Sequence, residues 1–447
     1  MVSCDLDLVK PPFSAPVGPG MPRKPSKPAN ERTPWPQYRS QHRRRSHEEA
    51  HAGDAAPIVP QVLEHRLVCD SEVLLVKDHD SLAKLIGELR AAGQFGYDSE
   101  FIGEHSYHPA LCVIQVATAN RVAIIDPLEG LELNPLWELL ADAAVQKIVH
   151  AGEPDLEPVV RHLGRPPVNI FDTQVAAAFA GLPYPMALGK LLHHVTGLEL
   201  MSSSRALKFS QWDHRPLSPA QLRYAADDVR YLPLLQHKLE EMLAANRTHE
   251  WAEEEFRMLC DPARYTFDAE SQRIRVRGVE KLTSRQRALL RNLISWRDAT
   301  ARTHNVPPRS LLRDEVVFEL SAAPVQTLQA LKQVPGLPRP VVREYAEEIL
   351  AITARALVEA GEPEDTEARP RVRKMDREQH RERVDAVWED IRRASVERAI
   401  DPGIVTSKRE LDRVLRAIEA GQSPTEFRLF TGWRRIFLTP ILNALTA

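Results

Sequence analysis

The sequence has few cysteines, no long apolar run and no large excess of either charge. Its 4 cysteines stand far apart and form no Cys-x-x-Cys pair, so neither a zinc ribbon nor a disulfide framework is indicated. Mean hydropathy is −0.35. No apolar run approaches the roughly 20 residues that span a bilayer, so we expect no membrane partner. These absences favour a protein of the reducing cytoplasmic compartment.

Several function-bearing motifs are also missing. The chain has no Gly-x-x-x-x-Gly-Lys-Ser/Thr loop, which argues against an ATP-driven motor, and no His-Glu-x-x-His zinc motif. The formal net charge of −3 does not by itself indicate a nucleic-acid partner. Basic residues would have to be gathered on particular surfaces for such a polymer to bind.

The composition changes along the chain and predicts several domains, as expected for 447 residues. Residues 1–65 are rich in proline and carry the basic run Arg43 to Arg45, which is typical of a disordered tail. In residues 66–262, short strand-like runs come first, and helices and strands then alternate. This order predicts an α/β domain with a mixed sheet.

The strand patterns stop after this domain and helical periodicity takes over. Residues 278–360 contain four or five amphipathic segments separated by proline or glycine, which predicts a helical bundle. Residues 361–376 are charged and lack periodicity, as in a linker, and residues 377–447 predict a second helical domain. We interpret Trp296 and Trp433 in these bundles as buried core residues.

Two segments each place polar functional groups on one face of a predicted element. In FGYDSEF, Asp98 and Glu100 are two residues apart, so they share one face of a strand. In SPAQLRYAADDVRYL, Ser218 can cap a helix that runs from Pro219 to about residue 244. Tyr224 and Asp228 then lie on one face of that helix because they are four residues apart, whereas Asp227 points elsewhere.

A third acidic residue, Asp155, follows a short apolar run in KIVHAGEPDLEPV. Each acid has an ordinary explanation on its own, as part of a solvated strand face, a helix first turn or a surface pair. Together, carboxylates gathered beside a core repel one another unless cations lie between them. The set therefore indicates a divalent-metal site, and two such ions can clamp the attacking and leaving oxygens of a phosphodiester.

The three segments, taken in this order, resemble the motifs of the DEDD superfamily of 3′→5′ exonucleases, in the branch with Tyr-x-x-x-Asp as its third motif. Within that branch the chain resembles bacterial ribonuclease D from about Val73 to the C-terminus. The resemblance implies a ribonuclease H-like exonuclease domain followed by two all-α domains of the HRDC (helicase-and-RNase-D C-terminal) type. The Trp296-Arg297 pair and the segment from Gly432 to Arg434 carry the helical part of the likeness.

The resemblance also implies roles for individual residues. The metal ligands would be Asp98, Glu100, Asp155 and Asp228, holding two Mg²⁺ or Mn²⁺ ions, and Tyr224 would position the attacking water. Substrate contacts would come from Tyr107, Leu111, Gln115 and Trp212. The stretch LELMSSSRALKFSQWDHRPL keeps the family's Ser210, Trp212 and Arg215 but is a few residues longer than usual.

By this resemblance the protein is expected to be a 3′→5′ exoribonuclease acting on tRNA precursors and other small structured RNAs. Two alternatives stay open at this point: an exonuclease directed at DNA, and a catalytically idle nucleic-acid adaptor. The residues alone do not choose between RNA and DNA, and they name no protein partner. The intact set of four acids and a tyrosine argues against the idle adaptor.

Overall fold

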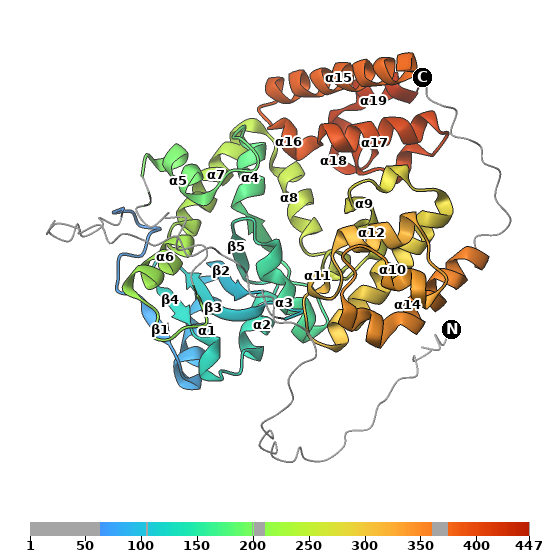
Figure 1. The fold of residues 1–447 in the computed structure, drawn as a ribbon. Coiled ribbons are helices and arrows are strands. Elements are labelled where there is room, and N and C mark those ends of the chain that lie inside the picture. Colours follow the sequence, from blue (N-terminus) through green and yellow to red (C-terminus); the bar gives the residue numbers. More distant parts are fainter. Residues whose placement is uncertain (1–62, 104–105, 199, 201–210, 360–373, 447) are drawn as a thin grey trace, which may run out of the picture. The chain divides into compact units, whose positions relative to one another are not determined.

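The computed structural model describes residues 63–103, 106–198, 200, 211–359 and 374–446 (Figure 1). The predicted N-terminal tail falls almost wholly outside these ranges, as do most of the charged linker and Ser210. Across the described residues, no helix combines the length and apolar character needed to cross a bilayer.

A mixed sheet forms the centre of the first domain, as predicted. Within the described residues, six strands are joined in the order β1-β4-β3-β2-β5-β6. Strands β2, β3 and β4 pair antiparallel, and the pairs β1–β4, β2–β5 and β5–β6 are parallel. Their bounds are β1 Leu74–Val76, β2 Gln94–Ile102, β3 Ala110–Ala117, β4 Val122–Ile125, β5 Gln146–Val149 and β6 Ile170–Asp172.

Helices cover both faces of this sheet and bury its alternating side chains. One face packs against α1 (His79–Ala92), α2 (Asn134–Leu140) and α3 (Glu153–Leu163), where Phe95 and Tyr97 of β2 join the core. The other face packs against α4 (Thr173–Phe179), α6 (Pro219–Arg230) and α7 (Leu232–Asn246). Helices α5 (Leu188–Thr196) and α8 (His249–Met258) extend this second layer.

Helix α6 crosses β2 at very short range. A Cβ atom added to Gly96 would lie 2.9 Å from the carbonyl oxygen of Val229 and 3.0 Å from Cβ of Leu232. Any larger residue at position 96 would therefore push the helix away from the strand. The glycine lets α6 approach the face of β2 on which Asp98 and Glu100 lie.

The start of α6 follows the sequence prediction, but its end does not. Ser218 accepts a hydrogen bond from the Gln221 amide, and the Gln221 side chain bonds back to the amide of Ser218, which forms a capping box. The expected single helix to about residue 244 is wrong, because α6 ends at Arg230 and α7 begins at Leu232. Pro233 explains the break, since a proline lacks the amide hydrogen and its ring clashes with the preceding turn.

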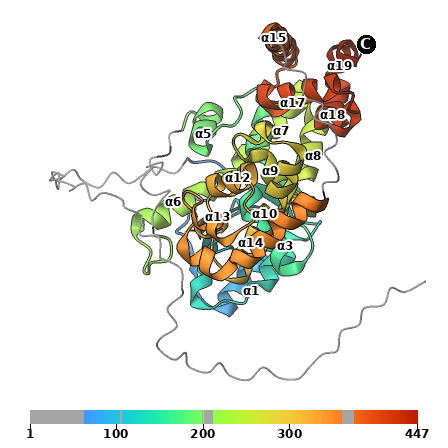
Figure 2. The same ribbon diagram turned by 45° about the vertical axis from the view of Figure 1, so that its right-hand side comes forward.

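Two groups of helices complete the chain, each gathered together in both views (Figures 1 and 2). The first comprises α9 (Ala269–Arg275), α10 (Ser284–Thr303), α11 (Pro308–Leu311), α12 (Asp314–Ala322), α13 (Leu328–Lys332) and α14 (Arg339–Glu359). The second comprises α15 (Lys374–Glu397), α16 (Pro402–Val405), α17 (Lys408–Glu419), α18 (Gly432–Phe437) and α19 (Thr439–Thr446). Trp296 is half-buried, so the prediction of a buried core residue is wrong here, and its indole Nε1 donates to Glu348 at 2.7 Å.

The second helical group shares a hydrophobic core with the α/β domain. Trp433 is fully buried, as predicted, and its ring meets that of Phe179 in α4 edge to face at 4.9 Å. Its indole Nε1 donates to the buried Glu255 of α8 at 2.7 Å. The guanidinium of Arg434 donates to the same Glu255 oxygen at 2.5 Å and to the carbonyl of Val405 at 2.8 Å.

Glu255 is thus a buried carboxylate held by cations from the second helical group. Burial by itself raises the pKa of Glu255, but Arg434, Arg428 and the Trp433 hydrogen bond outweigh burial and leave this pKa below its ordinary value. A carboxylate with a lowered pKa in the folded state stabilises the fold fully above its unfolded-state pKa of about 4.3. That contribution is lost as the pH falls through the folded-state value.

Replacing Glu255 by Gln should lower the free energy of unfolding by about 3–5 kcal/mol, because Arg434 would keep a buried charge without its partner. The measurement is urea unfolding at pH 7. The matched control is Glu253→Gln, since Glu253 is on the same helix, half exposed and 3.7 Å from His249; a change within about 0.5 kcal/mol is expected there. Equal losses in the two variants would contradict a special role for Glu255.

Candidate active site

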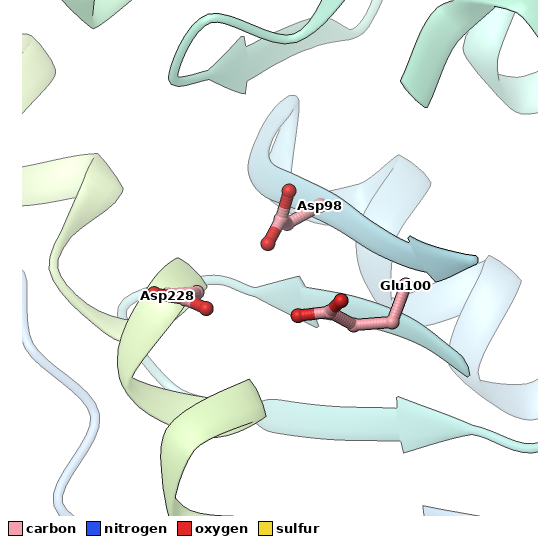
Figure 3. Close-up of side chains that lie close together, drawn as sticks. All are labelled: Asp98, Glu100 and Asp228. Atoms are coloured by element: carbon pink, nitrogen blue, oxygen red, sulfur yellow. The ribbon is translucent and has the colours of Figure 1, made fainter. Parts of the chain in front are cut away.

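The central feature of the site is a group of three carboxylates from two elements. Asp98 and Glu100 come from β2, and Asp228 comes from α6, which crosses the same face of the sheet (Figure 3). Each offers one oxygen that lies within 4.8 Å of the others. The neighbouring Asp227 instead lies 3.7 Å from Arg230 on its own helix.

Strand periodicity and a local irregularity aim the two strand acids. Asp98 lies opposite Gln115 of β3 in the antiparallel ladder, and Glu100 lies opposite Val113. The register shifts immediately after Glu100, between Glu100 and Phe101. Both acids therefore lie on the face of the sheet that α6 covers, and both precede the irregularity in the pairing of β2 with β3.

Asp155 approaches from the first turn of α3 and is held by the opposite face of β2. The hydroxyl of Ser99 donates to Asp155 Oδ1 at 2.5 Å, and the hydroxyl of Tyr97 donates to the Asp155 carbonyl oxygen at 3.1 Å. Asp155 is not in the group of three, but its charge helps to raise the pKa of Asp98. The structure thus places it beside the group, with its carboxylate hydrogen-bonded to Ser99.

Two of the four acids, Asp98 and Asp155, are held in surroundings unfavourable for negative charge. Burial raises the pKa of Asp98, and the charges of Asp155, Asp228 and Glu100 raise it further. Burial is also the largest cause of the raised pKa of Asp155. Oxygen donors of this kind suit hard divalent cations such as Mg²⁺ and Mn²⁺, whose charge would offset the repulsion. The donor set therefore fits a divalent-metal site.

Tyr224 lies one helical turn before Asp228 and is largely buried. Burial raises the pKa of its hydroxyl far above the ordinary value, and Asp228, Glu100 and Asp98 add to that effect. The hydroxyl is consequently protonated at neutral pH and can donate a hydrogen bond. As a neutral phenol it is a poor general base.

Trp212 packs beside Tyr224 in a loop that is anchored to the sheet. Its ring centroid lies 6.0 Å from that of Tyr224, and the residue is only 1% exposed. Arg215 anchors the loop: it donates to both oxygens of the buried Asp126 at 2.5 and 2.6 Å, and to the carbonyls of Trp212 and Cys112 at 2.8 Å. The Asp126 partner was not anticipated from the sequence, since 89 residues separate it from Arg215.

The remaining predicted substrate residues lie in different surroundings. Gln115 is fully buried, and neither its amide nitrogen nor its amide oxygen has a hydrogen-bond partner. Leu111 is half-buried and lines an open cleft of about 520 Å³ together with Trp137. Tyr107 lies between β2 and β3, where its hydroxyl contacts α10. Of the four predicted substrate residues, Leu111 alone is among the residues that line this cleft.

The turn that leads into α3 has support that sequence reasoning missed. Asp172 is buried and accepts hydrogen bonds from the amides of Ala151 at 3.1 Å and Gly152 at 3.2 Å. His150 contacts the Thr173 hydroxyl at 2.9 Å. The signal for Asp172 was its place before Thr-Gln at the start of a helix, where it caps α4.

Comparisons with known proteins agree with this geometry. A family model described as 3′-5′ exonuclease matches residues 73–244, and one described as HRDC domain matches residues 286–353. Ribonuclease D of Granulibacter bethesdensis is 34% identical over 82% of this chain and 90% of its own length. Ribonuclease D of Desulfotalea psychrophila is 30% identical over 81% of this chain and 96% of its own length.

The fold comparison gives the same result. The crystal structure of Escherichia coli RNase D, described as an exoribonuclease involved in structured RNA processing, matches with a TM-score of 0.70 and 27% identity. The match covers 84% of this chain and 98% of that one. An exonuclease domain of this type, with its acidic cluster, uses divalent metal. The chain belongs to the ribonuclease D family of 3′-5′ exoribonucleases.

Proposed function

We propose that the protein removes nucleotides one at a time from the 3′ ends of tRNA precursors and other small structured RNAs, by two-metal phosphodiester hydrolysis. The observation that carries the proposal is the convergence of Asp98, Glu100 and Asp228, with Asp155 beside them and Tyr224 one turn away. The family's exoribonuclease activity and the description of the Escherichia coli relative support RNA as the substrate.

Asp98, Glu100, Asp155 and Asp228 would hold two Mg²⁺ or Mn²⁺ ions. When bound, such ions supply a water of lowered pKa and a positive charge for the leaving 3′ oxygen. The ions also neutralise the acids that repel one another. Asp155 accepts the Ser99 hydroxyl through Oδ1, and a carboxylate has about four lone-pair sites, so acceptor capacity remains for an ion.

Tyr224 would orient the attacking water through its hydroxyl, which the raised pKa keeps protonated. Trp212 would act through Tyr224, because its buried ring packs beside the tyrosine and has almost no surface of its own for substrate. Gln115 would likewise act through its ladder partner Asp98, since it is fully buried. Tyr107 and Leu111 retain exposed surface and would contact the terminal nucleotide.

The direct test is incubation of the purified full-length chain with a 3′-extended tRNA and, in parallel, with matched RNA and DNA oligomers. The expected products are mononucleotides released stepwise from the 3′ end of RNA, only with Mg²⁺ or Mn²⁺ present. Internal cleavage, faster digestion of DNA, or activity in EDTA would each contradict the proposal.

Replacing Asp98 or Asp228 by Ala should reduce turnover by several orders of magnitude, because each variant removes an oxygen from the shared metal group. Folding should be retained, since repulsion among the acids is relieved. The wild-type melting temperature should rise on addition of Mn²⁺, and this rise should shrink in both variants. The matched control is Asp227→Ala, which removes the adjacent acid and should keep metal-dependent turnover.

Replacing Tyr224 by Phe keeps the ring that packs on Trp212 and removes only the hydroxyl. We expect the rate to fall by about 10²–10³-fold, in the range of positioned proton-handling groups. Stabilisation by Mn²⁺ should be unchanged, because the carboxylates remain. An unchanged turnover number at saturating RNA would show that the hydroxyl has no part in the reaction.

A further inference from the structure

The hydroxyl of Tyr107 is held by a helix of the HRDC domain. It donates to Asp298 Oδ1 at 2.6 Å and accepts from Arg302 Nη2 at 3.0 Å. Asp298 and Arg302 are four residues apart on α10, and the same guanidinium nitrogen donates to Asp298 Oδ2 at 3.2 Å. The three side chains therefore close a ring of hydrogen bonds between residues almost 200 positions apart in sequence.

Two further contacts fix the orientation of Tyr107. The Arg302 guanidinium lies over the tyrosine ring, 5.1 Å from its centroid. The backbone amide of Tyr107 donates to Asn305 Oδ1 at 3.2 Å. Side chain and backbone are thus bound at the same end of α10, which restricts both the position and the rotamer of the ring.

This residue is close in sequence to the metal-binding strand. Tyr107 follows Glu100 by seven positions, in the connection between β2 and β3. Its neighbour His108 packs edge to face on the tyrosine ring at 4.7 Å. His108 Nδ1 also lies 3.6 Å from Glu157, two residues after Asp155 on α3. The connection therefore touches α10 on one side and the helix of Asp155 on the other.

We propose that Asp298 and Arg302 are positioning residues of the exonuclease, which fix Tyr107 so that its ring can receive the 3′-terminal nucleotide. This inference rests on the proposed function, which gives Tyr107 a substrate contact. The HRDC domain then takes part in every catalytic cycle, with short RNAs as well as with large structured ones. Burial and the Asp298 bond raise the pKa of Tyr107, so its hydroxyl remains a donor at neutral pH.

The ring of contacts makes a specific prediction about coupling. Tyr107→Phe and Asp298→Asn each remove or weaken the same charge-assisted hydrogen bond, from the Tyr107 hydroxyl to the Asp298 carboxylate. Each should lower kcat/KM on a short single-stranded RNA about 10-fold, which corresponds to ~1.4 kcal/mol for one such hydrogen bond. The loss should appear as a higher KM. The kcat should stay within about two-fold of the wild-type value, because the proposed metal ligands are unchanged. The double variant should be no worse than the poorer single variant.

Two further variants separate the positioning of Tyr107 from effects of lost charge or lost folding. Arg309→Ala removes a well-exposed arginine of the same domain that pairs with Asp314 and does not contact Tyr107. Its kcat/KM should stay within about two-fold of the wild-type value. The variant thus shows what the loss of one positive charge from this domain does by itself. Should Asp298→Asn fail to fold, Arg302→Ala provides the same test, since the Arg302 side chain is 56% exposed.

The inference would be overturned if the two losses in kcat/KM multiplied in the double variant, or if Tyr107→Phe kept the wild-type KM. Neither result would count against the nuclease activity itself. A loss in kcat alone would overturn it too, since positioning of the nucleotide is measured by KM. Absence of metal-dependent RNA digestion by the wild-type chain would instead refute the proposed function itself. The two failures are therefore distinguishable in one series of assays.

Discussion

Mutual repulsion among closely spaced carboxylates is the constraint on which the catalytic domain is built. Asp98, Glu100 and Asp228 bring oxygens within 4.8 Å of one another, with Asp155 beside them. Such an arrangement is unfavourable without cations, so it has to be imposed by the surrounding structure. A strand with fixed side-chain alternation and a helix with a capping box supply rigid attachment points. The large buried core on both faces of the sheet provides the stability that this strain requires.

The helical domains are attached to the catalytic domain through charged groups as well as apolar ones. On one side, the buried Glu255 accepts from Trp433 and Arg434, and the second helical group continues the core of α4, α7 and α8. On the other side, α10 binds Tyr107 through Asp298 and Arg302 at a half-exposed contact. The first attachment is deeply buried and suited to permanent assembly. The second is more accessible and lies in the connection that leads from β2, the strand of Asp98 and Glu100.

Local patterns predicted most of the fold, and long-range contacts account for most of what they missed. The strand around Asp98, the cap at Ser218 and the helical C-terminal half follow from periodicity and capping rules, and the mixed sheet followed from the order of elements. The family resemblance predicted the exonuclease domain and the HRDC domain that matches residues 286–353; the HRDC type of the second helical group stays a prediction. The break at Pro233 is a local proline effect that the helical periodicity concealed. The Arg215–Asp126 pair and the Tyr107 contact depend on which segments meet in space. These contacts join residues far apart in the chain, so no short segment of the sequence predicts them.

The close crossing of α6 over β2 at Gly96 has a consequence for the spacing of the acidic group. Because one acid is carried by the helix and two by the strand, the gap between these elements sets how far apart the three carboxylates lie. A side chain at position 96 would meet the Val229 carbonyl oxygen at 2.9 Å and widen that gap. A glycine that carries no carboxylate thereby controls how closely Asp98, Glu100 and Asp228 approach one another.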